Sequence, residues 1–396
     1  MDETEEMTAV PPRLGPRPLA LHLGLATTAV AGSLASASLK ETGPVPWPKD
    51  LDIGTDDLAT RLDKIGSGDL IRMLAEEGSE KVQEMISGIR LYHRHPYQRA
   101  ARNRPILWQQ GTTRLLDGNP EAAENAPVIL FVPSLVNRAY ILDLMPGRSL
   151  VDHLAEAGLH PLLVDWNAPG ESEKEFNVEN YILKRICPIV DFVADAFPGA
   201  PLHLAGYCMG GTLTVAAAQF RQARLASFIA LAAPWDFHAG LADLARQLLA
   251  QKEMWDNVLA GFGELPVDLL QALFVSLDPN LGLRKFSMFA GMDMTSERAV
   301  EFVALEDWLN DGTALAKGVA ADCFDKWYGR NEPVANLWEV GGENVRPAEI
   351  KIPVLVTAPK VDKLVPRPSA LALAEALPEA TVVTPPSGHI GMVTSR

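Results

Sequence analysis

From about residue 105 onwards, the chain alternates short apolar runs with longer stretches that have a helical period. Short β-branched or apolar runs separated by helical stretches are typical of parallel strands joined by crossover helices. We therefore expect an α/β fold with a mostly parallel sheet. The predicted strands are Pro127–Pro133, His160–Asp165, Leu202–Ala205, Ser227–Ala232, Pro353–Ala358 and Ala380–Thr384.

Two regions depart from this alternation. Residues 51–95 show a helical pattern of apolar and charged positions, which predicts an N-terminal helical extension over about 1–100. Between the fourth and fifth predicted strands, residues 235–350 are rich in Trp, Phe, Leu and Met and predict a mainly helical insertion. An insertion at this point of a parallel sheet is expected to form a lid over a site at the carboxyl ends of the strands. The remaining part, 101–396, is predicted to be the catalytic domain, with the lid inserted into it.

The segment Leu19–Leu39 contains no Asp, Glu, Lys or Arg, and Arg13 and Arg17 precede it. Its many small residues and His22 make it less apolar than a typical membrane-spanning helix. The acidic start of the chain, MDETEE, differs from the basic start of a signal peptide. Three interpretations stay open: a helix packed on the protein or on a hydrophobic partner, a disordered segment, and a membrane-inserted helix.

Charge and cysteine content exclude several function classes. The net charge is -15 and the isoelectric point is about 5.0, which argues against a nucleic-acid partner because phosphate contacts need a basic face. Cys187, Cys208 and Cys323 lie far apart in the sequence and fit neither a metal site nor a disulfide framework. We expect no metal centre and a reducing compartment.

Residues 204–211 read LAGYCMGG, an apolar strand that runs into a glycine-flanked turn before a helix predicted over Thr212–Arg224. A sharp strand-to-helix turn strains the backbone of the residue at its tip, so small neighbours are needed at Gly206 and Gly210. The helix N-terminus beneath the sulfur of Cys208 favours a thiolate. Cys208 is therefore the candidate nucleophile; the alternative is a small cysteine buried in the core.

A thiol nucleophile needs a base, and the base needs an orienting acid. In the α/β-hydrolase arrangement the chain order is nucleophile, acid, histidine. Asp362 follows the strand PVLVTA, and His389 lies in a loop after the strand ATVVT, so these two residues are the candidate acid and base. Asp236, after the strand SFIALA, is the rival acid. Four other histidines have positions more typical of structural groups: His153, His160, His203 and His238.

The same arrangement predicts an oxyanion hole and a substrate-contacting loop. The N–H of Met209, directly after the nucleophile, is one expected donor. A second donor is expected in the loop after the first predicted strand, from Leu135 or Val136. In the same loop, Asn137 and Asp143 are candidate substrate-binding residues, and for Asp143 a purely loop-fixing role is the alternative.

Over about residues 100–392, the chain contains the stretches VNRAYILDLMPGRSLVDHL, LLVDWNAP, GYCMGGTL, EDWLNDG, FDKWYGRN, VDKLVP and SGHIG. Together, these stretches resemble the polyhydroxyalkanoate (poly-3-hydroxybutyrate) synthase family. The family fold is an α/β-hydrolase core with a mobile lid. Its catalytic cysteine, histidine and aspartate match Cys208, His389 and Asp362.

The resemblance implies an acyltransferase that polymerises (R)-3-hydroxyacyl-CoA into polyhydroxyalkanoate, with CoA release, through a covalent thioester on Cys208. The coenzyme A thioester is then a substrate, and no cofactor is expected. The implied partners are 3-hydroxyacyl-CoA and the growing polyester chain. The implied location is the cytoplasm, at the surface of polyester granules, and both a homodimer and a complex with an accessory subunit stay open.

Three features depart from the family pattern. The sequence ends seven residues after His389, before the terminal helix that supports the histidine loop in the family. Lys363 follows the acid where family members often have histidine, and the N-terminal part is of intermediate length. Two alternative functions therefore stay open: a cysteine-dependent α/β-hydrolase acting on thioesters or oligoesters, and a non-catalytic scaffold bound to granules.

Overall fold

The computed structural model describes residues 12–38, 61–62, 64–100 and 102–395. The chain divides into two compact units. The helical unit comprises Met1–Gln98 and Gln271–Asn310, and the sheet unit comprises Arg99–Leu270 and Asp311–Arg396.

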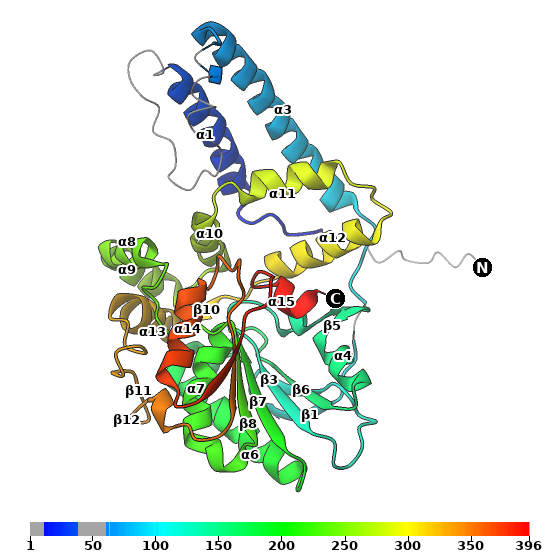
Figure 1. Ribbon diagram of the computed structural model, residues 1–396, viewed down its shortest axis with the longest axis vertical. Helices are drawn as coiled ribbons and strands as arrows, with labels where there is room; N and C mark the ends of the chain where they lie inside the picture. The colour runs from blue at the N-terminus through cyan, green and yellow to red at the C-terminus, as the bar shows by residue number, and fades with distance from the viewer. Residues whose placement is uncertain (1–11, 39–60, 63, 101, 396) are drawn as a thin grey trace, which may run out of the picture. The chain divides into compact units, whose positions relative to one another are not determined.

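The sheet unit is built on an eight-stranded sheet, which Figure 1 shows in cyan, green and red. The six strands from β6 to β14 are parallel to one another, whereas β2 runs antiparallel to both β1 and β6. In spatial order the strands are β1 (Ile106–Gln110), β2 (Thr113–Asp117), β6 (His160–Asp165), β3 (Val128–Val132), β7 (Leu202–Tyr207), β8 (Ser227–Leu231), β13 (Val354–Thr357) and β14 (Ala380–Val383).

All six predicted strands are confirmed, and the mostly parallel sheet with them. The sequence reading missed the edge hairpin of β1 and β2, whose apolar positions are fewer than those of the central strands. Its turn contains Gly111 with a φ of +58°, a backbone conformation that glycine adopts without steric cost. The central strand β3 is buried at every position, as expected for a strand covered on both faces.

Helices connect the parallel strands as crossovers. The helix after the nucleophile turn, α7, runs over Met209–Arg221, so it begins three residues earlier than predicted. In Figure 1, α7 lies along β7 and β8 in the middle of the sheet. The other helical elements joined to the strands are η2 (Ala139–Leu142), α4 (Leu150–Glu156), η3 (Glu173–Glu175), α5 (Val178–Tyr181), η4 (Ile182–Ile186), α6 (Cys187–Ala196), η5 (Gln222–Arg224), η7 (Pro347–Glu349), α14 (Arg367–Ala376) and α15 (Gly391–Thr394).

The predicted insertion at 235–350 is mainly helical, but its residues are shared between the two units. The part Gln271–Asn310 belongs to the helical unit, so the division at residue 100 and the lid role stay predictions. The remaining elements of the insertion, together with the hairpin β4–β5, are β4 (Asp143–Met145), β5 (Arg148–Ser149), α8 (Ala242–Ala250), α9 (Lys252–Phe262), β9 (Glu264–Leu265), α10 (Val267–Leu277), β10 (Leu315–Ala316), α13 (Lys317–Asp322), η6 (Cys323–Gly329), β11 (Glu339–Val340) and β12 (Glu343–Asn344).

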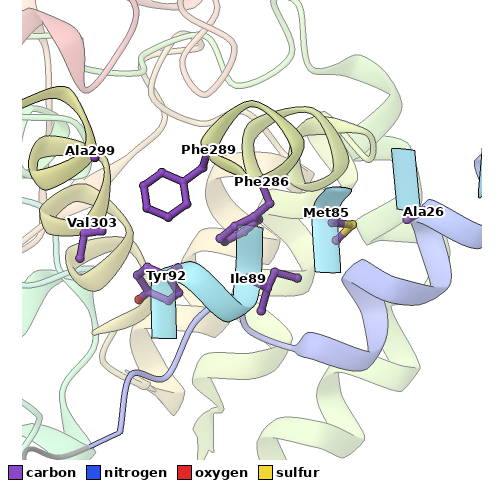
Figure 2. Packing of buried hydrophobic residues seen from close by; sticks show 8 residues of the cluster. All are labelled: Ala26, Met85, Ile89, Tyr92, Phe286, Phe289, Ala299 and Val303. Atoms are coloured by element: carbon purple, nitrogen blue, oxygen red, sulfur yellow. The ribbon is translucent and has the colours of Figure 1, made fainter. Parts of the chain in front are cut away.

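Within the described residues, four helices of the helical unit share one apolar core, two from the N-terminal part and two from the insertion. They are α1 (Leu19–Ser38), α3 (Ser67–Arg94), α11 (Leu281–Ala290) and α12 (Glu297–Asn310). Figure 2 shows their shared apolar core, in which each of the four helices contributes at least one side chain. The core residues are Ala26, Met85, Ile89, Tyr92, Phe286, Phe289, Ala299 and Val303.

Close helix contact and a partly buried polar network accompany this core. A Cβ atom at Gly88 of α3 would lie 2.0 Å from the carbonyl oxygen of Phe286 in α11, so only glycine allows this approach. Asp307 accepts hydrogen bonds from Arg13 Nε at 2.9 Å and from the Tyr92 hydroxyl at 2.8 Å. Arg13 also donates to the carbonyl oxygen of His95 at 2.7 Å. The N-terminal segment is thereby tied to the last helix of the insertion within this unit.

The segment Leu19–Leu39 forms helix α1 over Leu19–Ser38. Its length and composition would allow it to cross a membrane, a criterion that core helices and signal sequences also meet. Ala26 of α1 packs in the core of the helical unit. Part of the predicted N-terminal extension, including the Pro-rich stretch 42–48, lies outside the described residues.

Candidate active site

Cys208 sits on the turn between β7 and α7 with φ +57° and ψ -128°, a conformation that side-chain-bearing residues rarely adopt. Its N–H donates to the carbonyl oxygen of Leu231 at the end of β8, with an N–O distance of 2.9 Å. This bond fixes the strained residue to the neighbouring strand. The strained turn thus has the geometry that the sequence predicts for a nucleophile.

The neighbouring glycines are required by close contacts. A Cβ atom at Gly206 would lie 2.5 Å from the Cα of Gly211, and one at Gly210 would lie 2.1 Å from the carbonyl oxygen of Val132. Gly211 likewise lies against Ala233, because its Cβ would be 2.4 Å from that methyl group. Backbone atoms of β3, β7 and α7 therefore meet here at distances that exclude side chains.

Asp362 and His389 are brought together at the carboxyl edge of the sheet. Asp362 follows β13, and its Oδ2 lies 2.7 Å from Nδ1 of His389. The other carboxylate oxygen, Oδ1, accepts the N–H groups of Leu364 and Val365, each at 2.9 Å. Both side chains are buried. The carboxylate is therefore fixed in place and holds the imidazole by Nδ1, which leaves Nε2 available for proton transfer.

The protonation of His389 is coupled to Cys208. Burial alone would lower the pKa of His389, because it disfavours the charged imidazolium. The negative charge of Cys208 and the hydrogen bonds to Asp362 and Cys208 outweigh burial and raise the pKa of His389 to about 10. At neutral pH this arrangement therefore favours an imidazolium at His389.

The sheet unit matches a known family model over most of its length. The model described as "alpha/beta hydrolase fold" matches residues 127–395, which contain Cys208, Asp362 and His389. The chain belongs to the alpha/beta hydrolase fold family.

Curated relatives give a narrower similarity within this family. The chain is 29% identical to the "Poly(3-hydroxyalkanoate) polymerase subunit PhaC" of Haloferax mediterranei over 74% of its own length and 60% of the relative. It is also 29% identical to the PhaC subunit of Synechocystis over 73% of this chain and 79% of the relative. The chain thus spans less than two thirds of the Haloferax relative. Among solved structures, the thioesterase domain from the curacin biosynthetic pathway is 16% identical, with 74% of this chain and 95% of that domain covered and a TM-score of 0.43.

Within this alpha/beta hydrolase fold, the oxyanion hole stays a prediction, and its expected donors are backbone N–H groups. Met209 is the first residue of α7, where N–H groups have no acceptor within the helix. The N–H of Val136 donates to Ser134 Oγ at 3.2 Å. The Leu135 N–H has no acceptor within the part of the chain that the structure describes. Of the two predicted loop donors, Leu135 is therefore the one whose N–H is not already engaged.

The loop that carries these donors is held by contacts from two other parts of the chain. Trp166 Nε1 donates to the carbonyl oxygen of Pro133 at 3.0 Å. Thr313 donates through its hydroxyl to the carbonyl oxygen of Leu135 at 3.0 Å and through its N–H to that of Val136 at 3.2 Å. Asn137 forms a backbone bridge with Gly312. Its predicted substrate contact stays a prediction.

Asp143 lies in a buried ion network. Its carboxylate is within 3.0 Å of Arg104 Nη2 and 2.9 Å of Arg102 Nη1, and it accepts a bond from Ser149 Oγ at 2.6 Å. Asp152 contacts the same two arginines. These contacts satisfy the Asp143 carboxylate and fit the loop-fixing alternative, and a contact of Asp143 with substrate stays a prediction.

The rival acid Asp236 contacts groups of its own loop rather than His389. Its Oδ1 accepts the N–H of His238 at 2.9 Å and the side-chain amide of Asn331 at 2.8 Å. His238 in turn lies with Nε2 at 2.8 Å from the carbonyl oxygen of Tyr328. This network joins the loop after β8 to the end of η6, which is a structural role.

The other two cysteines differ from Cys208. Cys187 and Cys323 are buried, whereas Cys208 is partly exposed. Burial raises the pKa of Cys187 to about 11 and raises the pKa of Cys323 further. Both thiols are therefore unreactive at neutral pH.

The sequence pattern did not predict a role for one residue next to the nucleophile. Tyr207 precedes Cys208, and its ring stacks on the His389 imidazole with a centroid distance of 5.1 Å. The motif GYCMGG marks the position, but only the folded chain brings it beside a histidine 182 residues away. Within the described residues, no group of three or more His, Cys, Asp or Glu side chains is arranged to hold a metal ion.

Proposed function

We propose that the chain is an acyltransferase that polymerises (R)-3-hydroxyacyl-CoA into a polyester and releases CoA. The observation that carries the proposal is the strained Cys208 on its glycine-flanked turn, next to the hydrogen-bonded pair of His389 and Asp362. The similarity to polymerase subunits supports the choice of substrate. A cysteine suits acyl transfer because thiol exchange with a thioester is nearly balanced in energy.

In the first step, the Cys208 thiolate attacks the thioester carbonyl carbon. The N–H groups of Met209 and Leu135 stabilise the negative charge that develops on the carbonyl oxygen. When the tetrahedral intermediate collapses, the bond from the carbonyl carbon to the CoA sulfur breaks. His389 Nε2 gives its proton to the departing CoA thiolate, and the acyl group remains on Cys208.

In the second step, the neutral His389 accepts the proton of an incoming 3-hydroxyl group. The alkoxide oxygen attacks the acyl-cysteine carbonyl, an ester bond forms, and the bond to the Cys208 sulfur breaks. The Cys208 thiolate and the His389 imidazolium are regenerated together. Asp362 keeps the imidazole oriented throughout both steps.

Polymerisation requires that the hydroxyl group reaches the acyl-cysteine before water does. The insertion contributes a cluster of aromatic side chains to the sheet unit, in which the Trp327 ring stacks on Phe237 and lies edge-on to Trp338. All three are buried. We infer that this apolar cluster helps to exclude water from the part of the sheet unit that follows the carboxyl end of β8.

The test is incubation of the protein with 3-hydroxybutyryl-CoA while free CoA and insoluble polyester are measured together. We expect CoA release in step with polyester, and loss of both in a Cys208→Ala variant. Soluble hydroxy acid as the sole product would contradict the proposal and identify a cysteine-dependent hydrolase. CoA release that persists without Cys208 would remove the covalent mechanism.

Partner and location follow from the same proposal. The relatives are named as subunits, so the assay should be run with the chain alone and with a candidate accessory subunit. We further propose that the protein works in the cytoplasm at the surface of polyester granules, because the product is insoluble. Fractionation that finds the protein away from granules in polymer-producing cells would contradict this location.

A further inference from the structure

Tyr207, the last residue of β7, makes two separate contacts with His389. Its ring lies over the imidazole with a centroid distance of 5.1 Å and an angle of 29° between the planes. Its hydroxyl donates to the backbone carbonyl oxygen of His389 at 3.2 Å. One contact therefore acts on the ring of the candidate base, and the other acts on the loop that carries it.

These contacts complement the one from Asp362. The carboxylate holds the Nδ1 edge of the imidazole, whereas Tyr207 covers its face. The Nε2 atom of His389 is left to interact with the Cys208 sulfur. Tyr207 is only 2% exposed, so neither contact competes with water.

The Tyr207 ring also suits the charge state of its neighbour. The face of an aromatic ring is negative, and it attracts a cation within about 6 Å by about 0.5–2 kcal/mol. Burial and the charges of Cys208 and Asp362 raise the pKa of the Tyr207 hydroxyl well above its usual range. The hydroxyl therefore stays protonated and keeps donating to the loop at every pH at which the enzyme would work.

We propose that Tyr207 is a positioning residue that holds the His389 imidazolium beside Cys208, through its ring face and through its hydroxyl. The inference rests on the proposed function for its role in catalysis, but the pairing of His389 with Cys208 can be measured without acyl transfer. The alternative is that Tyr207 merely fills space at the end of β7. The two roles differ in their effect on the charge state of the pair.

The decisive measurement is the pH profile of Cys208 alkylation by iodoacetamide, read by mass spectrometry in the full-length native protein. An imidazolium stabilised by Tyr207 stabilises the thiolate in turn, because the coupling is reciprocal. We expect Tyr207→Leu to lower the alkylation rate at pH 6.5, relative to that at pH 9, by about 3- to 30-fold, the range of one cation–π contact. Tyr207→Phe keeps the ring and is expected to stay within about twofold of the wild type.

The hydroxyl contact has its own readout. Tyr207→Phe should increase amide hydrogen exchange in peptides that cover residues 384–392, because the loop loses its bond to the Tyr207 hydroxyl. Unchanged exchange in this variant would overturn the role of the hydroxyl.

Tyr181→Leu is the matched control. Tyr181 is a buried tyrosine of the same unit whose ring packs on Trp166 and Phe176 rather than on His389. We expect this variant to lose stability without a change in the shape of the alkylation profile. An equal change in Tyr181→Leu and Tyr207→Leu, or none in Tyr207→Leu, would overturn the proposal for the ring.

If Tyr207→Leu does not fold, Tyr207→Met replaces it, because methionine adapts to irregular spaces and also lacks the aromatic face. The outcome is separable from that of the proposed function. If the wild-type protein releases CoA but Tyr207→Leu keeps the wild-type pH profile of Cys208 alkylation, only the proposed role of Tyr207 is removed. If Tyr207→Leu changes the pH profile of Cys208 alkylation as expected but the wild-type protein releases no CoA, only the acyltransferase proposal is removed.

Discussion

The turn at Cys208 in the sheet unit and the core of the helical unit differ in how close together along the chain the residues that mark them lie. In the sheet unit, the conformation of Cys208 depends on Gly206 and Gly210, two positions away on either side. In the helical unit, Arg13 pairs with Asp307 across 294 positions, and Tyr92 bonds to the same carboxylate across 215 positions. The first kind of structure can be recognised from a short motif, and the second cannot.

The largest effect is expected from Gly210→Ala in the nucleophile turn. The new methyl carbon would lie 2.1 Å from the carbonyl oxygen of Val132, so the turn must open and the Met209 N–H must move. We expect CoA release to fall by about 100-fold or more, the size of losing an oxyanion-hole donor. The control is Gly261→Ala, since a Cβ atom there meets nothing within 4 Å. Equal CoA release by the two variants would mean that the turn is not under steric constraint.

In the helical unit, Phe286→Ala tests the long-range core. Phe286 is fully buried between α3 and α12, so truncation should cost about 3–5 kcal/mol in the free energy of unfolding of this unit. We expect faster hydrogen exchange in peptides from residues 67–94 and 281–290, with unchanged Cys208 alkylation. Met288→Ala on the same helix, where the side chain is 47% exposed, serves as the control. A simultaneous change at Cys208 would show that the two units unfold as one.

A smaller effect is expected from Arg13→Met, which removes the partner of a half-buried carboxylate. Asp307 would keep its bond from Tyr92 but lose the arginine, at a cost of about 1–3 kcal/mol. Hydrogen exchange over residues 297–310 reports the loss. Arg72→Met breaks an exposed pair with Asp69 and should cost about 0.5 kcal/mol or less. If both variants cost the same, the N-terminal segment does not stabilise this unit.

The smallest effect concerns pH. Burial, together with the charge of Lys285, lowers the pKa of His22 in α1. A histidine with a lowered folded-state pKa contributes stability above the unfolded value of about 6.5, and this contribution is lost as pH falls through the folded value. The free energy of unfolding of the helical unit should thus decrease from pH 7 to pH 5, and less so in His22→Gln. His93→Gln, at an exposed site on α3, should leave the slope unchanged.

Sequence patterns predicted the part of the molecule that local physics determines. The six parallel strands are continuous apolar runs, and the turn at Cys208 is marked by the glycines it needs. Asp362 and His389 could be placed because loops at the carboxyl ends of parallel strands converge. The helix start at Met209 was missed by three residues because glycines have low helix propensity, although here the turn geometry begins the helix.

What escaped prediction depends on which segments meet in three dimensions. Nothing in the sequence around Phe286 indicates that it packs against Tyr92, because the apolar face of a helix does not specify which other helix it will contact. The same holds for Asp143, whose two arginine partners lie about 40 positions earlier in the chain. Tyr207 is part of the GYCMGG motif, but its contact with His389 follows from the fold alone.

The discontinuous make-up of the helical unit has a consequence for synthesis on the ribosome. Helices α1 and α3 emerge first, yet the residues that complete their core end with α12 at Asn310. At about 5–20 residues per second, the roughly 200 intervening residues take about 10–40 s to be made. During that interval the apolar faces of the two helices have no native partner, so a chaperone that binds nascent chains would find its target here before the sheet is complete.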